Sequence, residues 1–209
     1  GQALALALDA AGMSRGDRFA LVMQNHPEFV EAMVASSICG TVFVPVDPRT
    51  RGEKLVYMLD FPGCRGAIIA DYALPEVLAV LPGTPGLEWL WVVSTGALEA
   101  LPEKPPVPVQ WVSALPPWAG KPLPVAVTDP REPMQMLFTS GTTGDPKAIV
   151  SSYARFDGVA SIGPLLGLQD SDVLYTGLSL THANAQLITL GNALKMGLPC
   201  VISRKFTMS

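Results

Sequence analysis

A loop rich in hydroxyls and glycines follows an expected strand in the second half of the chain. Residues 140–147 read SGTTGDPK and come directly after the run MQMLFT. The glycines can adopt backbone angles that other residues avoid, so the loop can wrap closely around a ligand. Hydroxyls, loop amides and a lysine ammonium all donate hydrogen bonds, which favours an anion and, among anions, a polyphosphate. The predicted phosphate-binding residues are Thr139, Ser140, Gly141, Thr142, Thr143, Gly144 and Lys147.

The spacing of this loop differs from that of the common P-loop. The P-loop pattern is G-x-x-x-x-G-K-[ST], with the lysine directly after a glycine. Here Pro146 precedes Lys147 and Ala148 follows it. From these residues alone, a plain Ser/Thr/Gly surface turn beside a strand is the alternative to a phosphate site.

The elements that must position this loop predict an α/β fold. Short apolar segments alternate with helix-like segments, which favours layered, mostly parallel sheets flanked by helices. In the helix after the first strand, Asn25 or His26 is the predicted cap, Pro27 opens the helix and Gly40 ends it. Strands are predicted over 18–23, 41–46, 66–70, 89–94, 134–139, 147–152, 172–176 and 199–203. Helices are predicted over 1–12, 25–40, 52–60, 74–81, 153–166 and 183–197.

Residues 101–133 interrupt this alternation, because ten of the chain's 20 prolines fall there. Proline removes backbone donors and favours an extended chain, so the stretch predicts a long connection over the surface. A disordered linker is the alternative, but Trp111 and Trp118 give the stretch something to pack with and favour an ordered crossing. The predicted α/β subdomains are 1–125, including the connection 101–125, and 126–209, where the phosphate loop and the start of the second subdomain lie.

Composition argues against several classes of partner. The chain has 209 residues, a net charge of −4 and a pI near 5.1, so it carries no electrostatic footprint for nucleic acid. Its mean hydropathy of +0.34 is high, yet no apolar run reaches the length of a membrane span. The surplus of apolar residues therefore predicts burial against something else, as in a piece of a larger protein or a homo-oligomer.

The cysteines and histidines predict neither disulfides nor a metal site. Cys39, Cys64 and Cys200 are odd in number and far apart, which favours reduced, packed thiols in a cytoplasmic protein. His26 and His182 are too few to build a zinc site with such cysteines.

Three segments resemble the adenylate-forming superfamily, which contains acyl-CoA synthetases, luciferases and peptide-synthetase adenylation domains. LFTSGTTGDPK is similar to the phosphate-loop signature TSGTTG-x-PKG, except that Ala148 replaces the final glycine. The stretch GDRFALVMQNHPEFVEAMVASSICGTVFVPVDPR resembles the part that precedes this signature. SLTHANAQ lies where relatives carry a histidine at the edge of the acyl pocket. The resemblance spans almost the whole chain, and within the superfamily it is nearest to the crotonobetaine/carnitine-CoA ligase-like branch.

The resemblance implies a two-step reaction. A carboxylate attacks the α-phosphate of ATP in the presence of magnesium, pyrophosphate leaves, and a thiol, usually that of coenzyme A, then takes the acyl group. The resemblance also implies that His182 and Asn184 lie at the acyl or thiol pocket. From residue types alone, His182 is equally a turn residue and Asn184 a helix cap.

The substrate implied is a small-molecule carboxylic acid. Relatives that activate α-amino acids usually carry F-D-A-S near the histidine segment, and its aspartate holds the substrate ammonium. Residues 178–203 contain no acidic side chain, which disfavours an α-amino acid.

Several motifs of the superfamily find no match in the chain. These are the adenine- and magnesium-binding Y-G-x-T-E, the ribose-binding aspartate, the hinge and the catalytic lysine of the C-terminal domain. The expectation is therefore an N-terminal portion that lacks the C-terminal catalytic domain and is inactive alone, with no catalytic residue to assign. Two alternatives stay open: a non-catalytic nucleotide-binding relative, which Ala148 favours, and an unrelated phosphate-binding α/β module.

Overall fold

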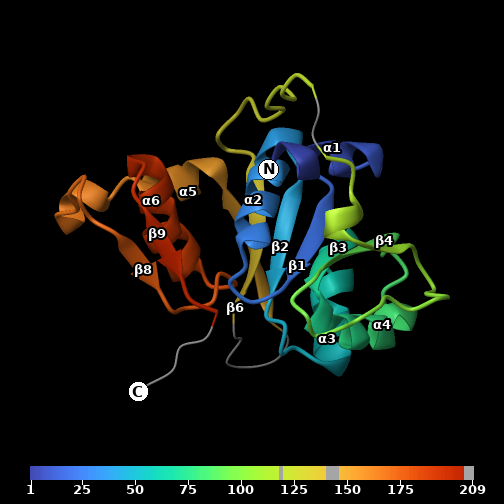
Figure 1. Cartoon of the computed structure of the whole chain (residues 1–209). Helices are drawn as coiled ribbons and strands as arrows, with labels where there is room; N and C mark the ends of the chain where they lie inside the picture. Colours follow the sequence, from blue (N-terminus) through green and yellow to red (C-terminus); the bar gives the residue numbers. More distant parts are fainter. Residues whose placement is uncertain (118–119, 140–145, 205–209) are drawn as a thin grey trace, which may run out of the picture.

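The computed structural model describes residues 1–117, 120–139 and 146–204. Its centre is a seven-stranded sheet with the order β5-β4-β3-β1-β2-β6-β7 (Figure 1). The strands from β5 to β6 are parallel to their neighbours, and β7 runs antiparallel to β6 at one edge. The strands are β1 (Arg18–Val22), β2 (Val42–Val46), β3 (Cys64–Ala70), β4 (Trp89–Val93), β5 (Val109–Trp111), β6 (Pro133–Thr139) and β7 (Lys147–Ser152). The predicted α/β class with mostly parallel sheets is confirmed.

Helices cover both faces of this sheet, as the buried strands require. On one face lie α1 (Gln2–Ala10) and α2 (Pro27–Cys39), and on the other α3 (Gly52–Asp60) and α4 (Leu74–Val80). The alternation within β1 decides which core each side chain enters: Phe19 and Leu21 pack with α1 and α2, whereas Ala20 and Val22 pack with α3 and α4.

Pro27 and Gly40 lie at the two ends of α2, as the sequence predicts. Pro27 occupies the first turn, where its missing N–H costs nothing. Gly40 ends the helix in a left-handed conformation with φ 71°, which glycine adopts without steric strain. His26, one of the two predicted caps, occupies the N-cap position, but neither Asn25 nor His26 caps the helix with its side chain. Both side chains instead bond to distant segments.

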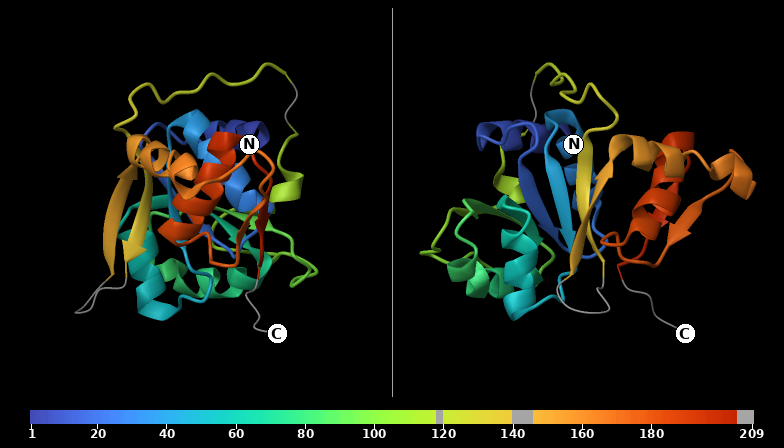
Figure 2. Two further views of the ribbon diagram at one scale, coloured as in Figure 1. Left: turned by 90° about the vertical axis from the view of Figure 1, so that its left-hand side faces the viewer. Right: turned by 180° about the vertical axis from the view of Figure 1, so that it is seen from behind.

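A second, smaller unit follows β7 and lies beside α2 (Figure 2). It contains α5 (Tyr153–Ala160), the parallel pair β8 (Leu174–Thr176) and β9 (Cys200–Ile202), a π-helix η5 (Asn184–Leu190) and α6 (Gly191–Met196). The helix predicted over 153–166 is shorter than expected. It stops at Ala160, and a 3-10 turn spans Gly163–Leu166, because Pro164 has no N–H to donate to the carbonyl oxygen of Ala160.

The described parts of the proline-rich stretch contact the rest of the molecule. The N–H of Ala126 donates to Ile38 O at 2.8 Å, and the N–H of Leu123 donates to Gln2 Oε1 at 3.0 Å. The stretch also adds strand β5 to the sheet, which the sequence did not predict. The division at residue 125 stays a prediction about subdomains, and β6 from the second part pairs with β2 from the first.

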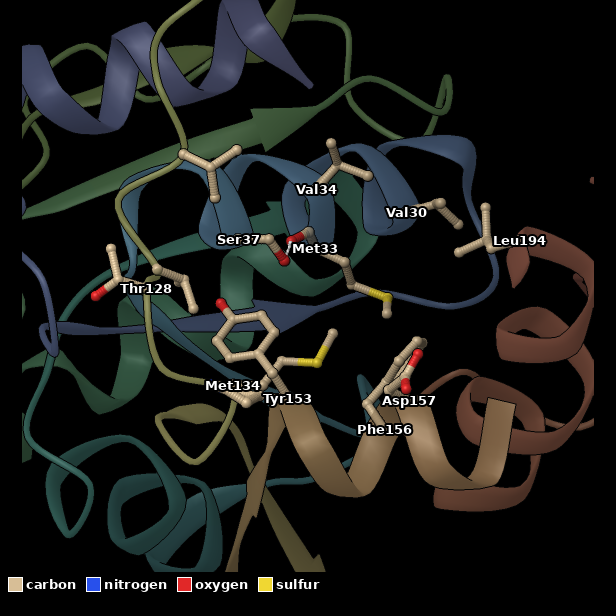
Figure 3. Close-up of a pocket in the computed structure, with 13 residues that line it drawn as sticks. Val30, Met33, Val34, Ser37, Thr128, Met134, Tyr153, Phe156, Asp157 and Leu194 are labelled. Carbon is tan, nitrogen blue, oxygen red and sulfur yellow. Dashed lines mark hydrogen bonds between the residues drawn. The ribbon is translucent and has the colours of Figure 1, made fainter. Parts of the chain in front are cut away.

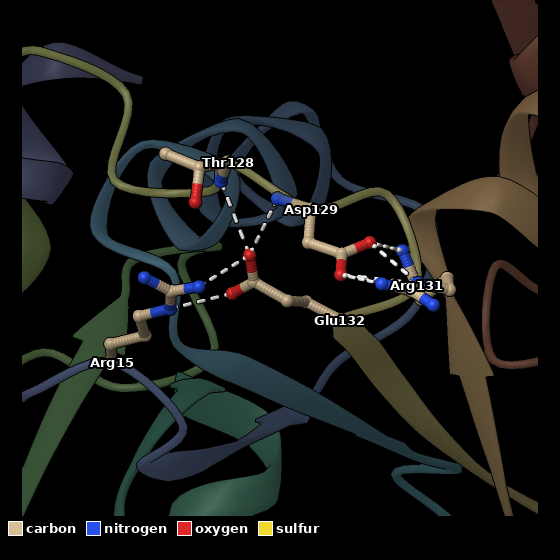
Figure 4. A network of polar contacts seen from close by, with 5 residues as sticks. All are labelled: Arg15, Thr128, Asp129, Arg131 and Glu132. Carbon is tan, nitrogen blue, oxygen red and sulfur yellow. Dashed lines mark hydrogen bonds and ion pairs between the residues drawn. The ribbon is translucent and has the colours of Figure 1, made fainter.

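A carboxylate network fixes the end of this stretch (Figure 4). Glu132 Oε1 accepts from the N–H groups of Thr128 and Asp129, at 3.1 and 2.9 Å. Its Oε2 accepts from Arg15 Nε at 2.6 Å. Together the backbone bonds and the Arg15 guanidinium hold the pKa of Glu132 below its usual value. The stretch is thereby tied to the loop before β1, directly ahead of the start of β6.

Candidate functional site

The carboxyl ends of the parallel strands form one edge of the main sheet, the lower edge in Figure 1. Ligands of open parallel sheets bind outside this edge. β6 ends there at Thr139 and β7 begins there at Lys147, and these two residues are partners across the antiparallel pair. Both are exposed, and no carboxylate of the described residues forms an ion pair with Lys147. A hydroxyl and a cation thus face solvent where an anion would bind.

The loop between these two residues cannot be described in the same way. Ser140, Gly141, Thr142, Thr143 and Gly144 lie outside the described residues, so their phosphate-binding role stays a prediction. What the structure adds is the context of the motif. The motif connects β6 to β7, which form an antiparallel hairpin, and this connection lies at the carboxyl edge of the sheet.

His182 lies near the same edge, close to the end of β2. Asp47 directly follows β2, and hydrogen bonds from Arg49 hold the pKa of its carboxyl below the usual value. His182 is close enough to Asp47 to contribute to this shift. β2 is the neighbour of β6 in the sheet, and β6 ends at Thr139.

Asn184 begins the π-helix η5 and is exposed, and its side chain makes no capping hydrogen bond. The helix-cap interpretation is therefore wrong, whereas pocket lining stays a prediction for both His182 and Asn184. A π-helix directly after His182 is itself informative, because such irregular turns occur frequently at functional sites.

Two buried amides that hold the His182 segment were not recognised from the sequence. Asn25 Oδ1 accepts from the N–H of Leu180 at 2.7 Å, and Gln186 Nε2 donates to the carbonyl oxygen of Leu180. The asparagine was visible in the sequence only as a possible helix cap, since its partners lie more than 150 residues away.

A polar cavity of about 590 Å³ opens at the carboxyl ends of β1 and β3. In it the Tyr72 hydroxyl accepts from the N–H of Gln24 at 2.7 Å and lies 3.2 Å from His26 Nε2. Burial, and then the charge of Arg204, lower the pKa of His26, and burial raises that of Tyr72, so both are neutral at pH 7. The cavity thus offers neutral donors and one cation. It is lined by Gln24, His26, Tyr72, Thr95, Ile202, Ser203 and Arg204.

A second cavity, of about 470 Å³, is apolar and lies between α2 and α5 (Figure 3). Met33 from α2, Met134 from β6 and Phe156 from α5 point into it. Met134 stands at the start of β6, so this cavity is about 16 Å along the strand from Thr139, at 3.3 Å per residue. It is therefore separate from the edge that carries Lys147.

Comparison with known proteins now assigns the class. A family model described as AMP-binding enzyme matches residues 2–209. The chain belongs to the AMP-binding enzyme family, as its resemblance to adenylate-forming enzymes predicted.

Individual relatives agree with this assignment. The chain is 25% identical over 206 residues to long-chain fatty acid transport protein 6 of Mus musculus, covering 97% of this chain and 32% of that protein. It is 27% identical over 207 residues to the medium/long-chain-fatty-acid–CoA ligase FadD6 of Mycobacterium tuberculosis, covering 98% and 32%. The chain thus spans about a third of the length of the curated relatives it matches.

Solved structures show the same fold. The anthranilate CoA ligase AuaEII, in complex with anthranoyl-AMP, superimposes with a TM-score of 0.82 at 20% identity, over 98% of this chain and 38% of that one. Acetoacetyl-CoA synthetase from Streptomyces lividans gives 0.81 at 21% identity, over 96% and 31%.

Two features are absent from the described residues. None of their helices combines the length and the apolar character needed to cross a bilayer. No three of their His, Cys, Asp or Glu side chains gather closely enough to hold a metal ion.

Proposed function

We propose that the protein containing this chain activates a carboxylic acid with ATP and transfers the acyl group to coenzyme A. One observation carries the proposal: the SGTTGDPK segment joins β6 to β7 at the carboxyl edge of the sheet, where it follows the exposed Thr139 and ends at the exposed Lys147. Membership of the AMP-binding enzyme family and relatives named as CoA ligases support it.

In the first step, an oxygen of the substrate carboxylate bonds to the α-phosphorus of ATP. The bond from that phosphorus to the oxygen bridging to the β-phosphate breaks, and pyrophosphate carries away the charge. Donors on the β- and γ-phosphates stabilise this developing charge. We assign that task to the loop hydroxyls and amides and to Lys147, whose charge about 4 Å from a phosphate is worth roughly 4 kcal/mol at an intermediate dielectric, before desolvation.

In the second step, the sulfur of coenzyme A bonds to the acyl carbon and its thiol proton is released to solvent. The bond from that carbon to the phosphate oxygen breaks, and AMP leaves. We assign His182 and Asn184 to the pocket where acid and thiol meet, because His182 is within electrostatic reach of Asp47, which follows β2, the neighbour of β6 in the sheet. Magnesium would accompany ATP and neutralise phosphate charge, and no described residue is assigned to it.

The substrate we propose is a carboxylic acid without an α-amino group. The absence of acidic side chains over 178–203 leaves nothing in that segment to hold an ammonium. Relatives named as fatty-acid–CoA ligases and fatty acid transport proteins favour a fatty acid among these. We propose a cytoplasmic enzyme that binds no nucleic acid, consistent with the net charge of −4.

The test is exchange of labelled pyrophosphate into ATP by the full-length natural protein. It is measured with long-chain, medium-chain, branched, aromatic and betaine acids and with α-amino acids. We expect exchange that depends on an added carboxylic acid and is not supported by α-amino acids. Exchange with α-amino acids only would overturn the substrate assignment. ATP binding without exchange in the presence of any acid would make the protein a non-catalytic nucleotide-binding relative.

A further inference from the structure

Asn25 uses both of its amide donors and its carbonyl oxygen to bond distant backbone groups. The side chain is buried, with 4% of its surface exposed. Its Nδ2 donates to Leu178 O and to Ser203 O, both at 2.8 Å, and its Oδ1 accepts from the N–H of Leu180 at 2.7 Å. Two carbonyls and one N–H fix the orientation of the amide, since only the NH₂ group can face the carbonyls.

These three bonds hold the smaller unit against the main sheet. Asn25 lies between β1 and α2, whereas Leu178 and Leu180 follow β8 and Ser203 follows β9. One side chain therefore joins the carboxyl ends of strands from both sheets. A side chain satisfies all three backbone groups only if it offers two donors and one acceptor at this spacing.

One of the residues that Asn25 binds, Leu180, lies two residues before His182. The backbone of Leu180 is held at both polar groups, by Asn25 at its N–H and by Gln186 at its carbonyl. Its side chain is fully buried in the same core cluster as Phe29 of α2. The N–H of His182 then donates to Ser179 O at 3.0 Å, so the turn that presents the histidine is built on this anchored segment.

We propose that Asn25 is a positioning residue that sets the place of His182 relative to Thr139 and Lys147. The inference rests on the proposed function, in which His182 lines the acyl or thiol pocket. Asn25 does not touch the reacting groups in this assignment. It acts through the backbone of Leu180, and its loss lets the histidine segment move while the phosphate loop stays on β6 and β7.

The test compares Asn25→Ala and Asn25→Asp with a matched buried amide. Asn192 is also buried, and its Nδ2 donates to Val159 O and Ile188 O at 3.2 and 2.7 Å, both outside the segment 177–183. Asn192→Ala therefore controls for the loss of a buried amide. Hydrogen–deuterium exchange of the segment 177–183 is the first measurement. We expect exchange to quicken roughly tenfold or more in Asn25→Ala and to stay within about twofold in Asn192→Ala.

The second measurement is steady-state kinetics of the full-length natural protein. We expect Asn25→Asp to raise the KM for acid or thiol roughly fivefold or more and to leave the KM for ATP within about twofold. In a His182→Ala background, the same Asn25→Asp change should have no further effect on the KM for acid or thiol, because the two residues act as one unit. Asn25→Asp keeps the acceptor for Leu180 and serves if Asn25→Ala does not fold.

The outcomes separate the two proposals. A wild-type enzyme without acid-dependent exchange overturns the proposed function. An active wild type whose Asn25 variants match Asn192→Ala in exchange and in KM overturns the positioning role alone. Effects of Asn25→Asp and His182→Ala that simply multiply would also overturn it, because independent residues are not coupled.

Discussion

At the scale of single residues, we propose Lys147 as a phosphate-binding group. It is exposed at the first position of β7, opposite Thr139. We expect Lys147→Ala in the full-length protein to lower kcat/KM for ATP at least about tenfold and to leave acid binding nearly unchanged. One lost charge–phosphate contact removes roughly 1.5–3 kcal/mol.

Lys195 supplies the matched control for this prediction. It is also an exposed lysine, but its ammonium pairs with Asp157 at 2.5 Å on α5, away from the hairpin. Lys195→Ala should leave ATP kinetics within about twofold, because surface ion pairs contribute little. Equal effects of the two substitutions in a pyrophosphate-exchange assay would show that Lys147 is a solvated surface residue that does not bind phosphate.

At the scale of elements, Asp71 joins the end of β3 to the loop after β4. Its carboxylate is fully buried and accepts from the N–H groups of Thr95, Ala97 and Leu98, as well as from the Thr95 hydroxyl. Asp71→Asn turns an amide NH₂ towards these donors. We expect a loss of about 1–3 kcal/mol in the free energy of unfolding, measured by urea denaturation. The exposed Asp157→Asn is the control, with less than about 1 kcal/mol expected.

The same carboxylate predicts a pH dependence of stability. Burial opposes ionisation of Asp71, but the Thr95 hydroxyl and the surrounding N–H groups outweigh it and hold its pKa below the usual value. The unfolded chain, with an Asp pKa of about 3.9, then binds more protons than the folded one, so stability rises with pH. The contribution is present above about pH 4 and is lost as pH falls through the folded pKa. In Asp71→Asn, the free energy of unfolding should therefore fall less steeply as pH drops below about 4. An unchanged pH dependence in this range would contradict the prediction.

At the scale of the whole molecule, the small β8–β9 sheet leaves apolar side chains in solvent. Tyr175 and Val201 are partners across the two strands and are 58% and 51% exposed. Exposed apolar strands favour association with other chains. We therefore expect the 209-residue chain to form homo-oligomers in a concentration-dependent way, as measured by sedimentation velocity.

Substitution at this sheet tests the origin of the association. Val201→Lys places a charge in the middle of β9 and should weaken it roughly tenfold or more. Gln110→Lys adds the same charge to the exposed middle position of β5, on the main sheet, and should leave it unchanged. Association that is insensitive to Val201→Lys, or absent in the wild type, would exclude the β8–β9 face as its cause.

The amino-acid sequence by itself determined the class of fold and the class of protein. Buried strands such as 42–46 and helix signals such as Pro27 and Gly40 depend on near neighbours in the chain, which is why the alternation could be read directly. The SGTTGDPK segment carried its strand context with it, and that combination led to the AMP-binding enzyme family. Local breaks were harder to predict, as the early end of α5 and the π-helix η5 illustrate.

Only the tertiary structure decided what surrounds the candidate site. Asn25 looked like a helix cap because an asparagine before a helix favours that role locally. The order of strands instead puts Asn25, after the end of β1, beside Leu178, Leu180 and Ser203. The side chain bonds backbone groups of these three residues, and it does not cap the helix. The same packing puts His182 within electrostatic reach of Asp47. Such contacts join residues far apart in sequence, so no local pattern encodes them, and they exist only once the sheets have assembled.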